Sequence, residues 1–388
     1  MSLTKDRDYF IFVIPFFLYF VPKYLEYTTF MNYDQFSKIV GFVKTTSYIL
    51  SLLLYFFKNF TYKCASRKAL LFLSVVFLFV TYMAVINDRK GLFVAVLLSV
   101  LYEHKFAKVF FRTVYYLSLV LYVFTIIAAL TGFIPNELAI IVKYGLTFKR
   151  LSLGFNYPGQ LTMMLIPIVF LYYYIKGKQI SVISNVFWLI VTIIIFAVSQ
   201  TIMGTIVCIV YIVLFNILKR KKTIRKISKK FIYTPWICAS ITVVLLFLYK
   251  INNGFVVFVD KVANGRINLG VEMIRVYGIK ILGTQFENNT VDYYQYLDSE
   301  YMHMFVAEGI LFTLVALVIC SLIVNYVIDN SDIFALLVWT LVFINAIFNN
   351  GIFNLVMNPF VIVLTESIRY FCSRKYHRYI YNKDIELT

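Results

Sequence analysis

Apolar runs of about 17–25 residues recur along almost the whole of this 388-residue chain. Each run is long enough to cross the hydrocarbon core of a bilayer as a helix, because a helix rises about 1.5 Å per residue. Charged residues make up only 14% of the chain, compared with about 25% in soluble domains. The sequence therefore predicts one all-α, polytopic membrane domain over residues 1–388.

The apolar runs predict about twelve transmembrane helices. The fourth is too short to cross alone unless it is tilted, the bilayer thins around it, or its bounds are wrong. The first lacks a small-residue cleavage site, so we do not interpret it as a signal peptide. The predicted spans are residues 9–22, 39–57, 69–86, 91–102, 114–134, 157–175, 182–199, 201–218, 231–249, 304–327, 333–348 and 351–368.

The positions of Lys and Arg predict the orientation. With the N-terminus placed inside, most of the 37 basic residues fall in cytoplasmic segments, as the positive-inside rule requires. The largest groups are the basic loop 219–230, which we expect to lie on anionic inner-leaflet lipids, and the tail 369–388. The net charge of +18 therefore indicates cytoplasmic loops and not a nucleic-acid-binding surface.

Two predicted outer segments are much longer than the others, a smaller loop at 135–156 and a large one at 250–303. Most of the glycines of the chain lie in or beside them, and glycine permits tight turns and close approach of the backbone to a ligand. Loops of this length in a compact protein are usually functional or disordered, and the large loop is too apolar for disorder. We therefore expect the functional site in these loops.

Within the large loop, residues 264–283 predict a turn followed by an amphipathic helix. Glu272 and Arg275 are three residues apart and are expected to pair on its surface. Arg266 lies at the start of the helix, where a cation gains nothing from the helix dipole, so it is either an anion ligand or a solvated side chain. The apolar positions at helical spacing are Ile267, Val271, Ile274, Gly278 and Ile281.

The stretch 284–311 is dense in Tyr, Asp and Glu and leads directly into a predicted span. Its tyrosines either anchor the chain at the membrane interface or stack on sugar rings. Its ionisable residues crowd the entry to a bilayer helix, where such groups are costly and tend to be functional. One of them is a candidate general base, and a solvated rim is the alternative. These residues are Tyr293, Tyr294, Tyr296, Asp298, Glu300, Tyr301, His303 and Glu308.

The smaller outer loop contains the adjacent cations Lys149 and Arg150, against the usual charge bias of outer loops. The planar guanidinium of Arg150 suits phosphate oxygens, although a solvated basic pair is the simpler interpretation.

Several motifs are missing from the sequence. It has no Walker A motif, no dinucleotide-binding glycine motif and no metal-binding His pair, and its five cysteines show no CxxC or His–Cys spacing. We therefore expect no cofactor, no metal and no disulfide.

Four short pieces, the last two of which form one stretch of the large loop, together resemble the bacterial Wzy-type polysaccharide polymerases, which are related to the O-antigen ligases. The piece "RLSLGFNYPGQL" (150–161) is similar to an Arg-x-x-Leu-Gly-Phe-x-x-Pro-Asn segment of that family, with Gly159 where Asn is common. The piece "GRINLG" (265–270) is similar to the Gly-Arg that opens the helix of the large outer loop. The pieces "ILGTQF" and "YLDSEYMHMFVAEGIL" resemble the turn and the Asp-containing stretch before the next span.

The resemblance implies a metal-independent, inverting glycosyltransferase of the GT-C superfamily in the bacterial cytoplasmic membrane, with both termini inside. It implies undecaprenyl-diphosphate-linked oligosaccharide substrates, joined at the outer leaflet into capsule, exopolysaccharide or O-antigen. Membrane lipid, a flippase and chain-length regulator proteins are the implied partners. Arg150, Arg266 and Arg275 are the expected diphosphate ligands. Asp298 is the first candidate base, followed by His303 and Glu300, and the expected sugar-binding residues are Tyr293, Tyr294 and Tyr301.

Other functions fit parts of the pattern. A flippase for lipid-linked oligosaccharides also has about twelve spans, but it should place its charges at membrane depth and have short outer loops. A membrane acyltransferase should carry a His or a Ser–His pair at its site, and His303 alone does not provide one. A receptor or scaffold explains the spans but not the outer Arg residues beside Asp298.

The predicted topology has a direct test in single-cysteine variants. Cysteines placed at Asn289 and at Ser228 should be labelled by a membrane-impermeant maleimide from opposite sides, because the first lies in the large outer loop and the second in the basic inner loop. Labelling of both from the same side would contradict the topology.

Overall fold

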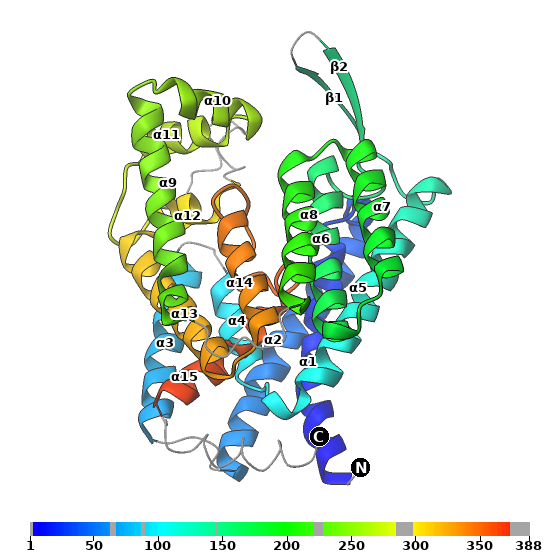
Figure 1. Ribbon diagram of the computed structural model, residues 1–388. Coiled ribbons are helices and arrows are strands. Elements are labelled where there is room, and N and C mark those ends of the chain that lie inside the picture. Colours follow the sequence, from blue (N-terminus) through cyan, green and yellow to red (C-terminus); the bar gives the residue numbers. More distant parts are fainter. Residues whose placement is uncertain are drawn as a thin grey trace. The chain divides into compact units, whose positions relative to one another are not determined.

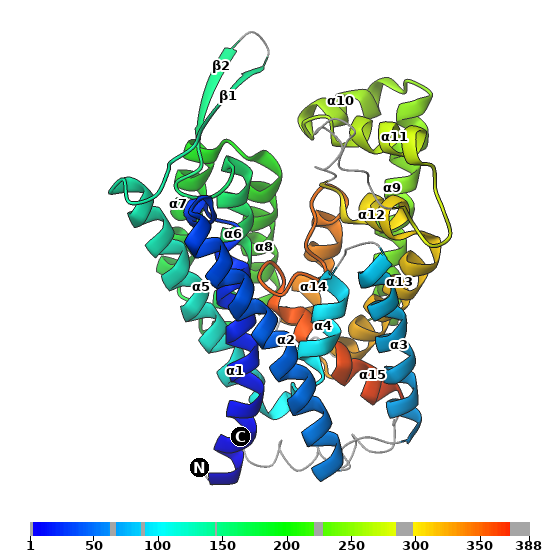
Figure 2. The ribbon, with the colours of Figure 1, turned by 180° about the vertical axis from the view of Figure 1, so that it is seen from behind.

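The chain is helical over most of its length in the computed structural model, which describes residues 3–62, 67–86, 90–143, 146–220, 228–284 and 298–372 (Figures 1 and 2). These residues form fifteen α-helices, several short 3-10 or π turns, and one two-stranded hairpin. They divide into two compact units, each built from several stretches of chain. Unit 1 comprises Met1–Lys58, Leu101–Ile224 and Leu355–Pro359, and unit 2 comprises Asn59–Val100, Arg225–Asn354 and Phe360–Thr388.

Many of the described helices are long and apolar enough to cross a membrane, so the chain is a mainly helical, multi-pass membrane protein. Seven of them reach full length, at Asp34–Leu54, His104–Leu130, Pro158–Gln179, Val182–Ser199, Ile202–Arg220, Lys229–Lys250 and Ile310–Asp329. Three shorter apolar helices accompany them, at Tyr9–Leu25, Leu71–Val85 and Ile333–Asn345.

The described chain has fewer full-length spans than the twelve predicted. The expected span 91–102 is helix α4 (Gly91–Ser99), whose nine residues reach only about 14 Å. The expected span 351–368 is not one helix, because a 3-10 turn at Pro359–Val363 leads into α15 (Leu364–Cys372). A proline has no N–H to donate to a preceding helix, so apolar composition alone does not produce a continuous helix there.

Unit 1 is built around helix α6. Of the residues in its apolar 18-residue stretch, 78% are buried, and the helix packs against α5, α7 and α8. One face of α7 is buried at Trp188, Thr192 and Ile195, at helical spacing, while Ile183 and Ile190 on another face are exposed, as expected for a lipid-facing surface. The elements of unit 1 are α1 (Leu3–Leu25), α2 (Asp34–Tyr62, which continues into unit 2), α5 (Ala107–Leu130), α6 (Pro158–Lys176), α7 (Val182–Ser199), α8 (Ile202–Arg220) and the short turns Thr29–Asn32, His104–Phe106 and Gly177–Gln179.

The smaller loop predicted at 135–156 contains regular structure. Strands β1 (Leu138–Lys143) and β2 (Leu146–Leu151) pair antiparallel and extend beyond the ends of α7 and α8 (Figure 1). The segment that follows is fixed to the loop after α1, since Thr29 N–H donates to the Gly154 carbonyl at 2.9 Å. Gly154 has a φ of 86°, and a Cβ there would lie 2.9 Å from the Thr125 carbonyl oxygen, so this position requires glycine.

Unit 2 is centred on helix α13, which packs against α9, α14 and α15. Helices α10 and α11 lie at one end of α9, and α15 lies toward the other end of this unit (Figures 1 and 2). The elements of unit 2 are α3 (Arg67–Ile86), α4, the turn Lys229–Tyr233, α9 (Thr234–Lys250), α10 (Gly254–Val262), α11 (Arg266–Tyr277), α12 (Glu300–His303), the π turn Met304–Glu308, α13 (Ile310–Asp329), α14 (Ile333–Asn345), the turn Pro359–Val363, whose first residue belongs to unit 1, and α15.

Polar side chains join three helices of unit 1. The Tyr173 hydroxyl on α6 donates to Asn185 Oδ1 on α7 at 2.8 Å. Asn185 Nδ2 donates to Asn216 Oδ1 on α8 at 2.8 Å, and Asn216 Nδ2 donates back at 3.0 Å. Such bonds hold membrane helices together where the hydrophobic effect cannot, because lipid tails are as apolar as the side chains.

We expect Asn216→Leu to lower the thermal stability of the purified protein. Each interhelical bond of this kind contributes about 0.6–1.7 kcal/mol, and two are lost. The Asn185→Leu, Asn216→Leu double variant should lose clearly less stability than the sum of the two single losses, since the Asn185–Asn216 pair is broken in each variant. Fully additive losses in a thermal unfolding assay would contradict the coupling.

Candidate functional site

The amphipathic helix predicted in the large loop is confirmed as α11. It begins at Arg266, where Asp260 Oδ1 accepts the Ile267 N–H at 2.7 Å and the Asn268 N–H at 3.1 Å. These bonds satisfy donors that have no partner within the first turn. The helix ends before Gly278, whose φ is 68°. Ile281, predicted for the apolar face, therefore lies outside the helix and is exposed.

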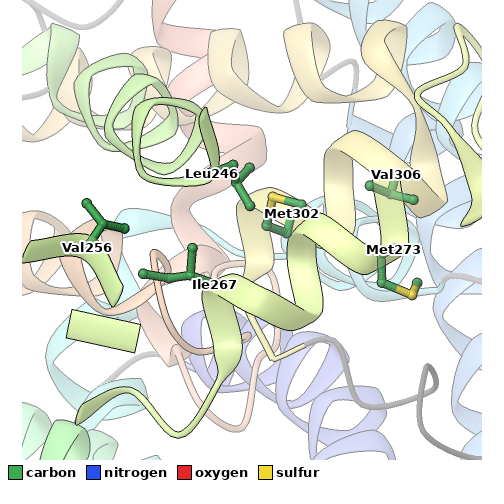
Figure 3. Close-up of a cluster of buried hydrophobic side chains, with 6 residues drawn as sticks. All are labelled: Leu246, Val256, Ile267, Met273, Met302 and Val306. Atoms are coloured by element: carbon green, nitrogen blue, oxygen red, sulfur yellow. The ribbon is translucent and has the colours of Figure 1, made fainter. Parts of the chain in front are cut away.

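An apolar cluster holds α11 against α9 and the start of the next span. Figure 3 shows its six buried side chains, which come from α9, α10, α11, α12 and the π turn. This packing fixes the position of the first turn of α11, and with it the position of Arg266. The buried residues are Leu246, Val256, Ile267, Met273, Met302 and Val306.

Arg266 joins three segments of unit 2. Its Nε lies 2.8 Å from Asp298 Oδ2, and its Nη1 donates to Asn349 Oδ1 at 2.6 Å and to the Phe348 carbonyl at 2.8 Å. Its side chain is only 17% exposed. The guanidinium is therefore fixed by charge-assisted bonds rather than solvated.

Asp298 is the carboxylate partner of this guanidinium. Its side chain is 36% exposed, and no second partner of its carboxylate is found in the described part of the chain. Burial raises the pKa of Asp298 above its ordinary value, although Arg266 opposes this shift by its charge and its hydrogen bond. A carboxylate with a raised pKa is a stronger base than an ordinary one.

Glu300 is fixed to the segment that follows α14. Its Oε2 accepts the Gly351 N–H at 2.7 Å, and its own N–H donates to the Ala346 carbonyl at 3.1 Å. Asn349 Nδ2 in turn donates to Asn345 Oδ1 at 2.7 Å. Asn345 and Asn349 were not predicted as site residues, and their signal in the sequence is a pair of amides at the end of an apolar run.

His303 and Glu308 form a second acid–base pair. His303 Nδ1 lies 3.4 Å from Glu308 Oε1, and both side chains are nearly buried, at 13% and 12% exposed. Within the described residues, the buried atoms His303 Nε2, Glu308 Oε2 and Thr284 Oγ1 have no hydrogen-bond partner. Glu308 ends a π turn at Met304–Glu308, and π turns in helices occur often at functional sites.

A backbone crossing holds residues 280–284, in the middle of the large loop, against the segment that contains Glu308. The Thr284 N–H donates to the Ala307 carbonyl at 3.0 Å, and the Ile310 N–H donates to the Lys280 carbonyl at 3.1 Å. Gly283 and Gly309 lie in contact, and a Cβ on either would collide with backbone atoms of the other segment. The two glycines thus allow the two backbone segments to approach each other closely.

Other predicted site residues lie apart from these groups or outside the described ranges. Tyr301 is fully buried and offers no ring face to a sugar, while Tyr293, Tyr294 and Tyr296 lie outside the described residues, as do most of the basic loop 219–230 and of the tail 369–388. Arg275 is 73% exposed and pairs with Glu272 at 2.5 Å, as expected from their spacing.

Arg150 belongs to unit 1. Its Nε donates to the Ser199 carbonyl at 2.6 Å and its Nη2 to Thr201 Oγ1 at 3.0 Å, so it connects β2 to the turn between α7 and α8. Lys149 beside it is exposed.

A small pocket adjoins Arg266 and Ser299 in unit 2. Its volume of about 10 Å³ is near the smallest that holds one water molecule, so this pocket is too small for a sugar. No group of three or more His, Cys, Asp or Glu side chains in the described ranges is placed to hold a metal ion.

Comparison with known proteins adds no relative: no family model, no curated protein and no solved structure matches the chain.

The position of Arg266 should depend on Asp260. We expect Asp260→Ala to lower the free energy of unfolding by about 1–2 kcal/mol, because the first turn of α11 loses its capping acceptor. Asp260→Asn is the matched control, since an asparagine caps as well as an aspartate. Equal thermal stability of the Ala variant and the wild type would show that this cap does not hold α11.

Proposed function

We propose that this protein is a polysaccharide polymerase of the Wzy type. It would join oligosaccharide repeat units carried on undecaprenyl diphosphate, at the outer leaflet of the bacterial cytoplasmic membrane, by inverting glycosyl transfer. The observation that carries the proposal is the Arg266–Asp298 ion pair, whose carboxylate lies on the same short segment as the His303–Glu308 pair, between the large loop and α13. The resemblance of residues 150–161, 265–270, 281–286 and 296–311 to that family supports it further.

In the proposed step, a hydroxyl oxygen of the acceptor sugar attacks the anomeric carbon of the donor. The bond between that carbon and the diphosphate oxygen breaks, and undecaprenyl diphosphate leaves with the electron pair. The hydroxyl proton passes to a carboxylate or an imidazole. Asp298 is our first candidate for this base, because burial raises its pKa and one of its oxygens is not used by Arg266.

His303 is the second candidate base. Its Nδ1 faces Glu308, and its Nε2 has no partner among the described atoms, so Nε2 is the atom that would accept the proton. Glu308 would orient the ring and stabilise the imidazolium. Glu300 is the weakest candidate, because its Oε2 already accepts the Gly351 N–H.

Arg266 would stabilise the negative charge that develops on the leaving diphosphate. A guanidinium can bond phosphate oxygens in a bidentate manner, and here the Arg266 Nε already pairs with one carboxylate oxygen of Asp298. A diphosphate that binds Arg266 would compete with Asp298 and leave its carboxylate free for the acceptor. The exposed Arg275, on the same helix as Arg266, remains a candidate for a further contact to the diphosphate. Arg150, in unit 1, stays a prediction from the sequence alone.

Polymer formation in a strain that lacks the protein, complemented with variants, tests the proposal. We expect Asp298→Asn and the Arg150→Ala, Arg266→Ala double variant to reduce polymer by about 10²–10⁴-fold, because each removes a group that acts in the transition state. Lipid-linked single units should accumulate at the outer leaflet. The exposed Lys261→Ala in α10 is the matched control and should make polymer normally.

Two outcomes would contradict the proposal. Accumulation of lipid-linked units at the inner leaflet in the strain without the protein would indicate a flippase. Normal polymer from Asp298→Asn, at wild-type protein levels, would remove Asp298 from the site and leave His303 as the base to test.

A further inference from the structure

The middle of the large loop carries an exposed apolar segment, which the proposed reaction does not use. It follows directly after α11, and its side chains Ile279, Ile281 and Leu282 are 47%, 68% and 41% exposed. Lys280 between them is exposed as well. Exposed apolar side chains that gather in this way mark a surface in contact with another molecule or with a membrane.

The outer face of the neighbouring helix α13 is apolar too. Leu311, Leu314 and Val318 are 40%, 46% and 44% exposed, and they recur three and four residues apart, so they lie on one face of the helix. Helix α13 is long and apolar enough to cross a membrane. An exposed apolar stripe on such a helix is the surface that contacts lipid tails.

Hydrogen bonds join the exposed segment directly to the first turn of α13. The Lys280 carbonyl accepts the Ile310 N–H, and the Ile281 carbonyl accepts the Leu311 N–H, each at 3.1 Å. The first N–H groups of a helix have no partner within the helix, and hydrocarbon offers none either. The segment therefore satisfies these donors, and Ile281 lies at the level of the first turn of α13.

The length of α13 determines the depth of that turn in the membrane. Its 20 residues rise about 30 Å, which equals the thickness of the hydrocarbon core. Its far end is polar, since Asp329 Oδ2 accepts the Tyr370 hydroxyl at 3.1 Å and Asp329 Oδ1 lies 3.9 Å from Lys229 Nζ. With that end at one surface of the core, the first turn lies at the opposite surface and not beyond it.

We propose that residues 279–282 insert into the lipid leaflet on the side of the large loop. Ile279, Ile281 and Leu282 contact the acyl chains and continue the lipid-facing stripe of α13, while the long side chain of Lys280 reaches the phosphate groups. Because α11 leads directly into this segment, the insertion holds the loop that carries Arg266 against the membrane surface. The inference rests on exposure, depth and backbone bonds and not on the proposed transfer reaction.

Nitroxide-labelled cysteine variants of the full-length protein in proteoliposomes test the insertion. Cys64 and Cys372 are first replaced by serine, and the other three cysteines are buried and should not react. The label on Ile281→Cys reports its collisions with oxygen, which concentrates in hydrocarbon, and with a water-soluble nickel chelate. We expect the ratio of oxygen to nickel collisions to be several-fold higher than at an aqueous position of the same loop.

Two further labels in unit 2 calibrate this ratio. Leu314→Cys, on the exposed stripe of α13, should give the value for lipid, and Lys261→Cys, in the exposed last turn of α10, the value for water. A ratio at Ile281→Cys equal to that at Lys261→Cys would place the segment in water and overturn the proposal. Few collisions with either reagent would show that protein covers the segment, from this chain or a second copy, and would overturn it as well.

Ile279→Cys keeps the proposal testable if Ile281→Cys does not fold, because it labels a second exposed position of the same segment. Its ratio should also exceed that of Lys261→Cys. Thermal unfolding of each labelled variant shows whether it is folded. An aqueous ratio from a folded Ile279→Cys variant would contradict the insertion.

Discussion

Inside a bilayer, no water is available to satisfy backbone N–H and C=O groups, so the protein itself must supply every partner. The long helices meet this requirement alone, but unit 2 also contains helices too short to cross. There, side chains replace the missing backbone bonds. Arg369 Nη2 donates to the Val100 carbonyl just after α4, and Glu300 accepts the Gly351 N–H in the irregular segment after α14. Much of the polar chemistry of unit 2 follows from these interruptions.

The candidate site uses the same polar groups. Arg266 donates to the Phe348 carbonyl and to Asn349, so it stabilises the irregular segment, and it also pairs with Asp298. An arginine with these three partners is held in place before any substrate binds. Preorganised charge of this kind stabilises a transition state without further rearrangement. The structural and the proposed catalytic role of Arg266 are therefore difficult to separate by mutation, which is why the controls Lys261→Ala and Asp260→Asn matter.

Much of the candidate site could be predicted from the sequence. The clustering of Asp298, Glu300, His303 and Glu308 at the entry to an apolar run marked the region, because charges are costly there. Three of these residues have defined partners in the structure, and Asp298 meets Arg266, which lies 32 positions earlier in the chain. Tyr301, expected to bind sugar, is instead a core residue. An aromatic ring serves equally well in a core and on a binding surface, so its identity alone did not decide its place.

The sequence by itself determined the membrane class, most of the helices, and the amphipathic helix with its Glu272–Arg275 pair. The length of an apolar run and the helical spacing of its residues are local properties, so they can be recognised in the sequence without knowledge of the tertiary contacts. The tertiary structure decided which apolar runs break into short helices, the hairpin at Leu138–Leu151, and the partners of Arg266. These depend on contacts between segments far apart in the chain, where turn geometry and available hydrogen-bond partners outweigh local hydrophobicity.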